Sequence, residues 1–178
     1  MPQDRFSVKS ILSSLFLTKC YWLALFVLGL LMEGGALYYQ HVLGEEPCQV
    51  CIHIRILTAA FMLLSAVMLV LPSTKLISLS GHLINSLGMM WLWERCWFLL
   101  SVENGNATSS CNFYLGFPDW FALDKWFPEV FEVRALCSFT PELLFGISMA
   151  QGLITIASVL VLASISLLII NSMQLLRS

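Results

Sequence analysis

Four long apolar stretches limit what this chain can fold into. A helix that crosses the hydrocarbon core of a bilayer needs about 20 mostly apolar residues. The four stretches span approximately residues 20–39, 52–71, 76–97 and 143–170. Of the 178 residues, 58% are hydrophobic and only 11% are charged, which is too apolar for an ordinary soluble domain. The sequence therefore predicts an all-α membrane protein. Residues 1–178 are expected to form a single domain, which is a four-helix transmembrane bundle.

Positive charges predict how the chain is oriented. Lys and Arg gather on the cytoplasmic side of membrane proteins. They stand before the first span, in the turn between the second and third spans, and in the tail: Arg5, Lys9, Lys19, Lys75 and Arg177. Both termini are therefore expected in the cytoplasm, with outer loops of about 40–51 and 98–142. In a bacterium this describes a multi-pass inner-membrane protein, with four of its six cysteines facing the oxidising periplasm.

A Cys-x-x-Cys pair stands where the first outer loop meets the second apolar stretch. Unpaired backbone N–H groups and the helix dipole at a helix start favour the thiolate, so Cys48 and Cys51 are expected to have a lowered thiol pKa. Arg55 follows Cys51 by four residues on the same helix face, where it can stabilise an anion at that sulfur. Two alternatives are an Arg55 that snorkels to the headgroups and a zinc site completed by Cys111 and Cys137. Those two cysteines stand too far apart in the sequence for known structural zinc spacings.

An aromatic segment bounded by prolines lies between the two cysteines of the second outer loop. Residues 117–131 combine Trp and Phe with Asp and Lys, and they are too short and too charged to cross a membrane. This pattern predicts a short membrane-parallel helix in the headgroup region. Such a helix keeps Cys111 and Cys137 close to Cys48 and Cys51, so that exchange between the pairs is intramolecular. A simple aromatic anchor for the loop is the alternative.

Several other residues are candidates for a role. Glu33 is the only acid inside the first span, and an intramembrane carboxylate is a functional candidate, with a hydrogen bond inside the bundle as the alternative. His41 lies at the outer boundary and fits either a proton relay or a surface position. Cys96 lies near the outer end of the third span, and Cys20 is expected to be a buried, reduced thiol. No basic patch indicates nucleic-acid binding.

Taken in order along the chain, these residues resemble the disulfide bond formation protein B (DsbB) family. The resemblance covers nearly the whole chain. It implies a quinone-dependent protein-disulfide oxidoreductase that reoxidises a periplasmic, thioredoxin-fold oxidant similar to DsbA and passes the electrons to a membrane quinone, ubiquinone or menaquinone. The residues that carry it are Glu33, Gln40-His41-Val42, Pro47-Cys48-x-x-Cys51 with Arg55, Cys111, Phe117-Pro118-x-Trp120-x-x-Leu123-Asp124-Lys125-Trp126-x-Pro128, and Cys137.

The resemblance also implies a role for each cysteine outside the membrane. Cys111 matches the cysteine that forms the mixed disulfide with the soluble oxidant, and Cys137 matches its partner in the loop. Cys48 and Cys51 match the membrane-proximal pair. Within that pair, Cys51 is expected to contact the quinone, assisted by the cation Arg55. No metal is implied.

Two features leave alternatives open. The family contains a histidine shortly before the second cysteine pair, and no histidine occurs here between Trp91 and Cys111. Glu94, Arg95 or neighbouring aromatics replace it, or quinone binding differs. This unusual stretch also fits a DsbB-like paralogue with a dedicated oxidant or client. A different class is a non-enzymatic, tetraspanning scaffold whose outer disulfides only staple its loops, in which case they stay oxidised.

Overall fold

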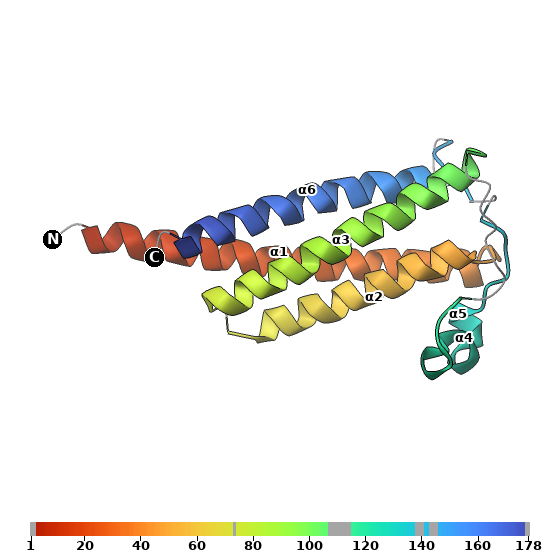
Figure 1. Cartoon of the computed structure of the whole chain (residues 1–178), viewed down its shortest axis with the longest axis horizontal. Helices are drawn as coiled ribbons and strands as arrows, with labels where there is room; N and C mark the ends of the chain where they lie inside the picture. The colour runs from red at the N-terminus through yellow and green to blue at the C-terminus, as the bar shows by residue number, and fades with distance from the viewer. Residues whose placement is uncertain (1–2, 73, 107–114, 138–140, 143–145, 177–178) are drawn as a thin grey trace.

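The structure, a computed structural model, is built around four long helices that run side by side (Figure 1). It describes residues 3–72, 74–106, 115–137, 141–142 and 146–176. The predicted all-helical class is confirmed. The long helices are α1 (Gln3–His41), α2 (Gln49–Val70), α3 (Lys75–Glu103) and α6 (Met149–Leu176).

The helices pair along their lengths. α3 packs along α6, α1 packs along α2, and α2 also contacts α3. The beginning of α1 and the end of α6 lie at the same end of the bundle as the α2–α3 turn, and the start of α2 lies at the opposite end (Figure 1). Gly88 permits the contact between α2 and α3, because a Cβ atom there would stand 2.8 Å from the Phe61 ring. The start of α2, with Cys48 and Cys51, is therefore placed where three other long helices can contribute to a site.

The outer surface of the bundle is apolar, as contact with lipid requires. Within the described residues, three helical segments are long and apolar enough to cross a membrane: Thr18–His41, Gln49–Val70 and Met149–Met173. Their outward side chains include Leu31, Leu63, Val159 and Leu162, each more than 60% exposed. α3 is less apolar because it carries polar and charged side chains, among them Glu94 and Arg95. A fourth span at residues 76–97 therefore stays a prediction.

Lys19 of α1 closes the end of α2 that lies away from the cysteines. Its Nζ atom donates to the backbone carbonyl oxygens of Met68, Leu69 and Leu71 at 2.8–2.9 Å. The last carbonyls of a helix lack intrahelical partners and carry the negative end of its dipole, so a cation there is stabilising. Pro72 follows and has no N–H to continue the helix. From the sequence, Lys19 indicated only the orientation of the chain in the membrane. The structure shows that it also caps the C-terminal end of α2.

The segment between α3 and α6 contains residues 117–131, here called the insert. Three short helical turns form where the sequence predicts one short helix, because the backbone leaves helical geometry at Ala122 and Phe127. Pro128 also has no N–H with which to continue the preceding turn. The turns are η1 (Asp119–Phe121), α4 (Leu123–Trp126) and α5 (Pro128–Phe131).

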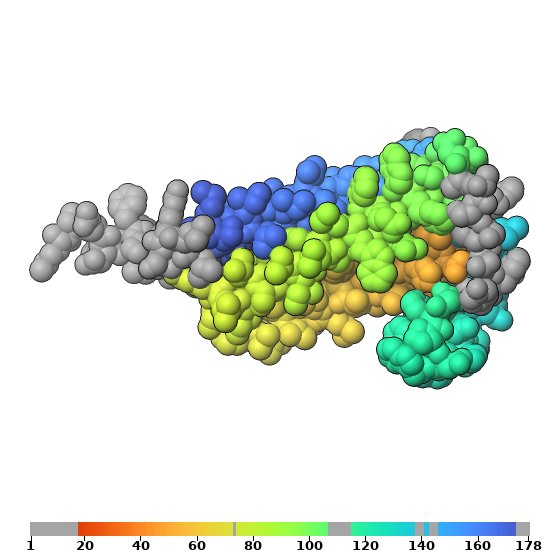
Figure 2. Space-filling view, viewed as in Figure 1, coloured from red at the N-terminus to blue at the C-terminus, as the bar shows by residue number. Residues whose placement is uncertain are grey.

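The insert protrudes from the side of the bundle close to the start of α2 (Figures 1 and 2). Its inner side belongs to a small apolar cluster built around Ile52 of α2, which is fully buried. Phe117 and Phe131 of the insert pack against this cluster. Trp120 and Trp126 point outward and are 76% and 55% exposed. The insert is thus amphipathic, and its orientation parallel to a membrane stays a prediction.

Candidate functional site

Cys48 and Cys51 form a dithiol in the first turn of α2. Cys48 is the N-cap residue, and its Sγ atom accepts a hydrogen bond from the backbone N–H of Cys51 at 3.3 Å. Both cysteines are free thiols. The pKa of Cys48 is lowered chiefly by its hydrogen bond with the Cys51 thiol, helped by the backbone N–H groups of Cys51 and Val50, although burial acts against it. The helix start therefore favours a thiolate at Cys48, so the predicted lowering of the thiol pKa is confirmed for Cys48 only.

Arg55 lies one helical turn beyond Cys51 and is buried, with 7% of its surface exposed. Its Nη1 atom donates to Oε1 of Gln40 at 2.7 Å and to the backbone oxygen of Val130 at 3.1 Å. Its Cζ atom also lies 5.8 Å from the centre of the Phe131 ring, a cation–π distance. A guanidinium with these contacts does not extend into water, which argues against the snorkelling alternative.

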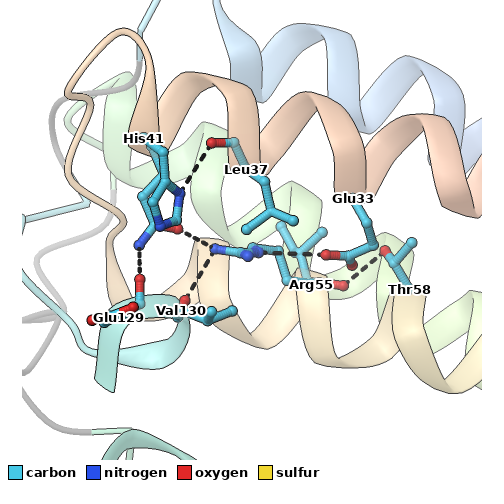
Figure 3. A network of polar contacts seen from close by, with 9 residues as sticks. Glu33, Leu37, His41, Arg55, Thr58, Glu129 and Val130 are labelled. Carbon is cyan, nitrogen blue, oxygen red and sulfur yellow. Dashed lines mark hydrogen bonds and ion pairs between the residues drawn. The ribbon is translucent and has the colours of Figure 1, made fainter. Parts of the chain in front are cut away.

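Glu33 is the charge partner of Arg55. Its Oε2 atom lies 3.5 Å from Nε of Arg55 and it reaches the site from α1, on the opposite side from Val130 (Figure 3). The side chains of Arg55 and Glu33 are 8% and 19% exposed. The carboxylate compensates a charge that would otherwise be costly to bury. Its Oε1 atom has no hydrogen-bond partner among the described residues.

A cavity of about 210 Å³ adjoins the dithiol between α1, α2 and α6. Cys51, Arg55 and Glu33 form part of its wall, and most of the remaining wall is apolar. Leu31 and Ile156 also line it, and both are exposed on the outer surface of the bundle. A redox-capable sulfur, a cation and an apolar space close to the lipid-facing surface therefore meet at one place.

The segment that leads to Cys137 is paired with the residue before Cys48. The backbone N–H groups of Arg134 and Ala135 donate to the Pro47 oxygen at 3.1 and 3.3 Å, and Ala135 forms an isolated parallel bridge with Cys48. Cys137 is disulfide-bonded and belongs to the same buried cluster as Cys48. The structure thus brings three of the four predicted redox cysteines to one end of the bundle. The fourth, Cys111, lies outside the described residues.

The other candidate residues do not line the Cys51 cavity. His41 is exposed, and its ring nitrogen contacts only the Leu37 oxygen of its own helix, at 3.2 Å, among the contacts of the described residues. Cys96 is a free, buried thiol in the bundle core. Cys20 is free as expected but exposed, so the prediction that it is buried was wrong. Within the described ranges, no three His, Cys, Asp or Glu side chains gather as a metal site would need.

A second cavity, of about 330 Å³, lies on a different face of α2. His53 and Arg95 line it together with Trp91 and the insert residues Phe117 and Phe121. The stretch that departs from the family pattern therefore contributes Arg95 to this second cavity and not to the wall around Cys51. Glu94 pairs with Arg95 at 3.0 Å. Whether either residue takes the place of the family histidine stays open, because that depends on where the quinone binds.

Sequence reasoning missed how Arg55 is held. Gln40 was noted only as part of a motif, yet it accepts a hydrogen bond from Arg55 and donates from Nε2 to the Glu129 oxygen at 2.7 Å. One signal existed, since Glu33 and Gln40 are seven residues apart and therefore share a face of α1. The contributions of Val130 and Phe131 had no such signal, because they depend on how the insert packs.

Apolar helices, a dithiol at a helix start and a disulfide-bonded neighbouring loop define a helical membrane protein with a thiol–disulfide site. The chain belongs to the DsbB family, because the family model for the disulfide bond formation protein DsbB matches residues 18–167. It is a membrane disulfide bond formation protein.

Relatives with this name match most of the chain. It is 35% identical to disulfide bond formation protein B 2 of Pseudomonas aeruginosa over 137 residues, which cover 74% of this chain and 79% of the relative. Disulfide bond formation protein B of Photorhabdus laumondii is 36% identical over 83% of this chain and 88% of its own length. The Shewanella amazonensis protein of that name is 30% identical over 85% and 90%.

Proposed function

We propose that the protein is a quinone-dependent thiol:disulfide oxidoreductase of the bacterial inner membrane, which reoxidises a periplasmic DsbA-like dithiol protein. One observation carries the proposal. Cys51 and Arg55 line the same largely apolar cavity near the lipid-facing surface, which is where a membrane-dissolved acceptor has access.

The redox steps follow from disulfide exchange. The two thiols of the soluble partner reduce the disulfide between Cys111 and Cys137 through a mixed disulfide at Cys111, and they leave as a disulfide. The Cys111 and Cys137 thiols then reduce the disulfide between Cys48 and Cys51. Oxidation of the Cys48 and Cys51 thiols back to a disulfide releases two electrons and two protons. When bound, a quinone supplies the acceptor for both and leaves as a quinol.

The residues around the cavity fit a quinone. Apolar walls from α1, α2 and α6 suit a ring with an isoprenoid tail. Arg55 offers N–H donors and a permanent positive charge, which stabilises negative charge on the Cys51 sulfur or at a carbonyl oxygen beside it. Glu33 keeps the pair neutral before the reaction. The lowered pKa of Cys48 supports its role in exchange with the loop cysteines, because a thiol with a low pKa leaves readily in disulfide exchange.

We propose four membrane spans, with α3 as the fourth, and both termini in the cytoplasm. The positive-inside pattern supports this orientation, and it places the Cys48 end of the bundle and the insert at the periplasmic surface. The exposed Trp120 and Trp126 then lie at the depth where aromatic side chains favour the membrane interface.

Two alternatives remain to be tested against this proposal. A scaffold whose disulfides only staple its loops needs neither a lowered thiol pKa at Cys48 nor a cation beside an apolar cavity, so those features favour an enzyme. A paralogue with a dedicated oxidant or client uses the same site and differs only in its soluble partner.

The test uses the purified protein in lipid nanodiscs with ubiquinone or menaquinone and a reduced thioredoxin-fold oxidant. Partner thiols and quinone absorbance are followed together. The proposal expects many turnovers, with one quinone reduced for every two partner thiols oxidised. Oxidation that stops after the protein's own disulfides are consumed, with no quinol formed, contradicts it.

A further inference from the structure

We propose that Gln40 is a positioning residue that fastens the insert to Arg55, so that the docked insert sets the orientation of the guanidinium beside Cys51. This inference rests on the proposed function and adds to it a mechanical link between the second outer loop and the quinone site.

Gln40 binds both Arg55 and the insert through its one side-chain amide group. Its Oε1 atom accepts from Arg55 Nη1 at 2.7 Å, and its Nε2 atom donates to the Glu129 backbone oxygen at 2.7 Å. A neutral amide is suited to this place because it offers an acceptor and a donor side by side. A carboxylate accepts from Arg55 but cannot donate to a carbonyl oxygen.

Arg55 also contacts the insert directly. The Val130 oxygen accepts from Nη1 at 3.1 Å, and the Phe131 ring lies under the guanidinium. The guanidinium is therefore held between Glu33 of α1 and α5 of the insert (Figure 3). If the insert leaves this position, Arg55 loses the Val130 oxygen and the Phe131 ring and, among these contacts, retains Glu33 and Gln40.

The fastening point is close in sequence to Cys137. Phe131 precedes Cys137 by six residues, and Arg134 and Ala135 between them bind the Pro47 oxygen. The segment that leads to Cys137 is thus attached at two places, one beside Cys48 and one at Arg55. Docking of the insert therefore both brings Cys137 towards Cys48 and orients the cation for the transfer from Cys51. When the insert undocks for exchange with a soluble partner, Cys137 is released from Cys48 and Arg55 loses its contacts with the insert.

The first measurement is amide hydrogen exchange of residues 129–132 in the oxidised protein without quinone, so that it does not depend on turnover. Loss of one hydrogen bond by Gln40→Ala is expected to speed exchange about fivefold. Gln40→Glu should act similarly, because it keeps the acceptor for Arg55 and removes the donor to Glu129. His41→Ala is the matched control, since His41 is the next residue, exposed, and bound to its own helix.

The second measurement is steady-state kinetics with varied quinone and varied partner. Gln40→Ala and Gln40→Glu are expected to lower kcat/KM for quinone about tenfold through a mispositioned Arg55, with kcat/KM for the partner nearly unchanged. A purely structural defect would instead lower both together. Combining Gln40→Ala with Arg55→Met should cost little more than Arg55→Met alone, because Gln40 acts through Arg55.

Wild-type exchange and wild-type quinone kinetics in Gln40→Ala overturn the proposal. A Gln40→Glu variant that matches the wild type overturns the fastening role, since the bond to Glu129 is then dispensable. If the wild-type protein itself reduces no quinone, the proposed function fails, while the exchange comparison still judges the link between Gln40 and the insert.

Discussion

Arg55 and Glu33 form an ion pair inside the helix bundle, with Nε and Oε2 3.5 Å apart. They come from α2 and α1, so the pair joins two long helices beside the cavity that Cys51 lines. A buried charge that loses its partner is left without compensation. The pair therefore bears on both the stability of the bundle and the charge at the site.

Replacing Glu33 by Ala is expected to destabilise the protein by about 3 kcal/mol, because the Arg55 charge stays buried. Reversible unfolding in mixed micelles measures the change. Glu94→Ala is the control, since Glu94 pairs with Arg95 where both side chains are substantially exposed. Such a pair contributes at most about 1 kcal/mol. An equal loss of unfolding free energy in the two variants would show that the buried Arg55–Glu33 pair stabilises the protein no more than the exposed Glu94–Arg95 pair.

Replacing Arg55 by Met or Gln is expected to slow quinone reduction, or raise the quinone requirement, without preventing partner binding. Arg55 is buried beside a largely apolar cavity, where developing negative charge is poorly screened, so the cation is expected to matter there. Arg55→Lys keeps the charge with a different donor geometry and should give an intermediate rate. Stopped-flow mixing separates the quinone step from exchange with the partner, which should be unchanged. Normal quinone kinetics in Arg55→Met would show that Arg55 does not take part in quinone reduction.

The lowered pKa of Cys48 has a consequence for pH. A thiol with a lowered pKa keeps its thiolate at lower pH, so its titration midpoint should fall below the ordinary value of about 8.5. The same shift stabilises the fold above the unfolded-state pKa, and this contribution is lost as pH falls through the folded-state pKa.

Thiolate absorbance of the reduced protein, taken as the difference from Cys48→Ala, measures the titration. Cys51→Ala should raise the midpoint, because the Cys51 thiol is the main cause of the shift. A midpoint at or above the ordinary value in the wild type would be inconsistent with a thiolate role for Cys48.

Removing Cys111 is expected to block transfer from the soluble partner while Cys48 and Cys51 stay oxidised. In Cys137→Ser, Cys111 can attack the disulfide of the oxidised partner, and the mixed disulfide should accumulate because the thiol that resolves it is missing. In Cys48→Ser, the mixed disulfide formed by the reduced partner at Cys111 should also accumulate, because the loop cysteines cannot pass the electrons on. Non-reducing gels after acid quenching and thiol trapping show these species. Normal partner oxidation by Cys111→Ser would mean that another cysteine receives the electrons.

The sequence predicted what depends on local pattern. Helix-start chemistry located Cys48 and Cys51, and the spacing of four residues placed Arg55 on the face of Cys51. Both follow from helix geometry alone. The apolar stretches likewise predicted the helical class, since backbone groups in lipid must be satisfied within a segment.

Tertiary packing decided the rest. The backbone oxygens of Glu129 and Val130 hold Gln40 and Arg55, and backbone groups carry no sequence signature. The broken backbone at Ala122 and Phe127 turned one expected helix into three turns. The second cavity, which separates Arg95 from the Cys51 site, depends on where the insert packs.

Photolabelling by a light-reactive quinone analogue tests most directly whether Cys51 and Arg55 share a quinone site. The protein is illuminated in nanodiscs, digested and analysed by mass spectrometry, with excess unmodified quinone as competitor. We expect competable adducts on residues 31–39, 51–58 and 149–156, which contain the wall of the Cys51 cavity. Adducts confined to the wall of the second cavity, at Trp91, Arg95, Phe117 or Phe121, would contradict the assignment.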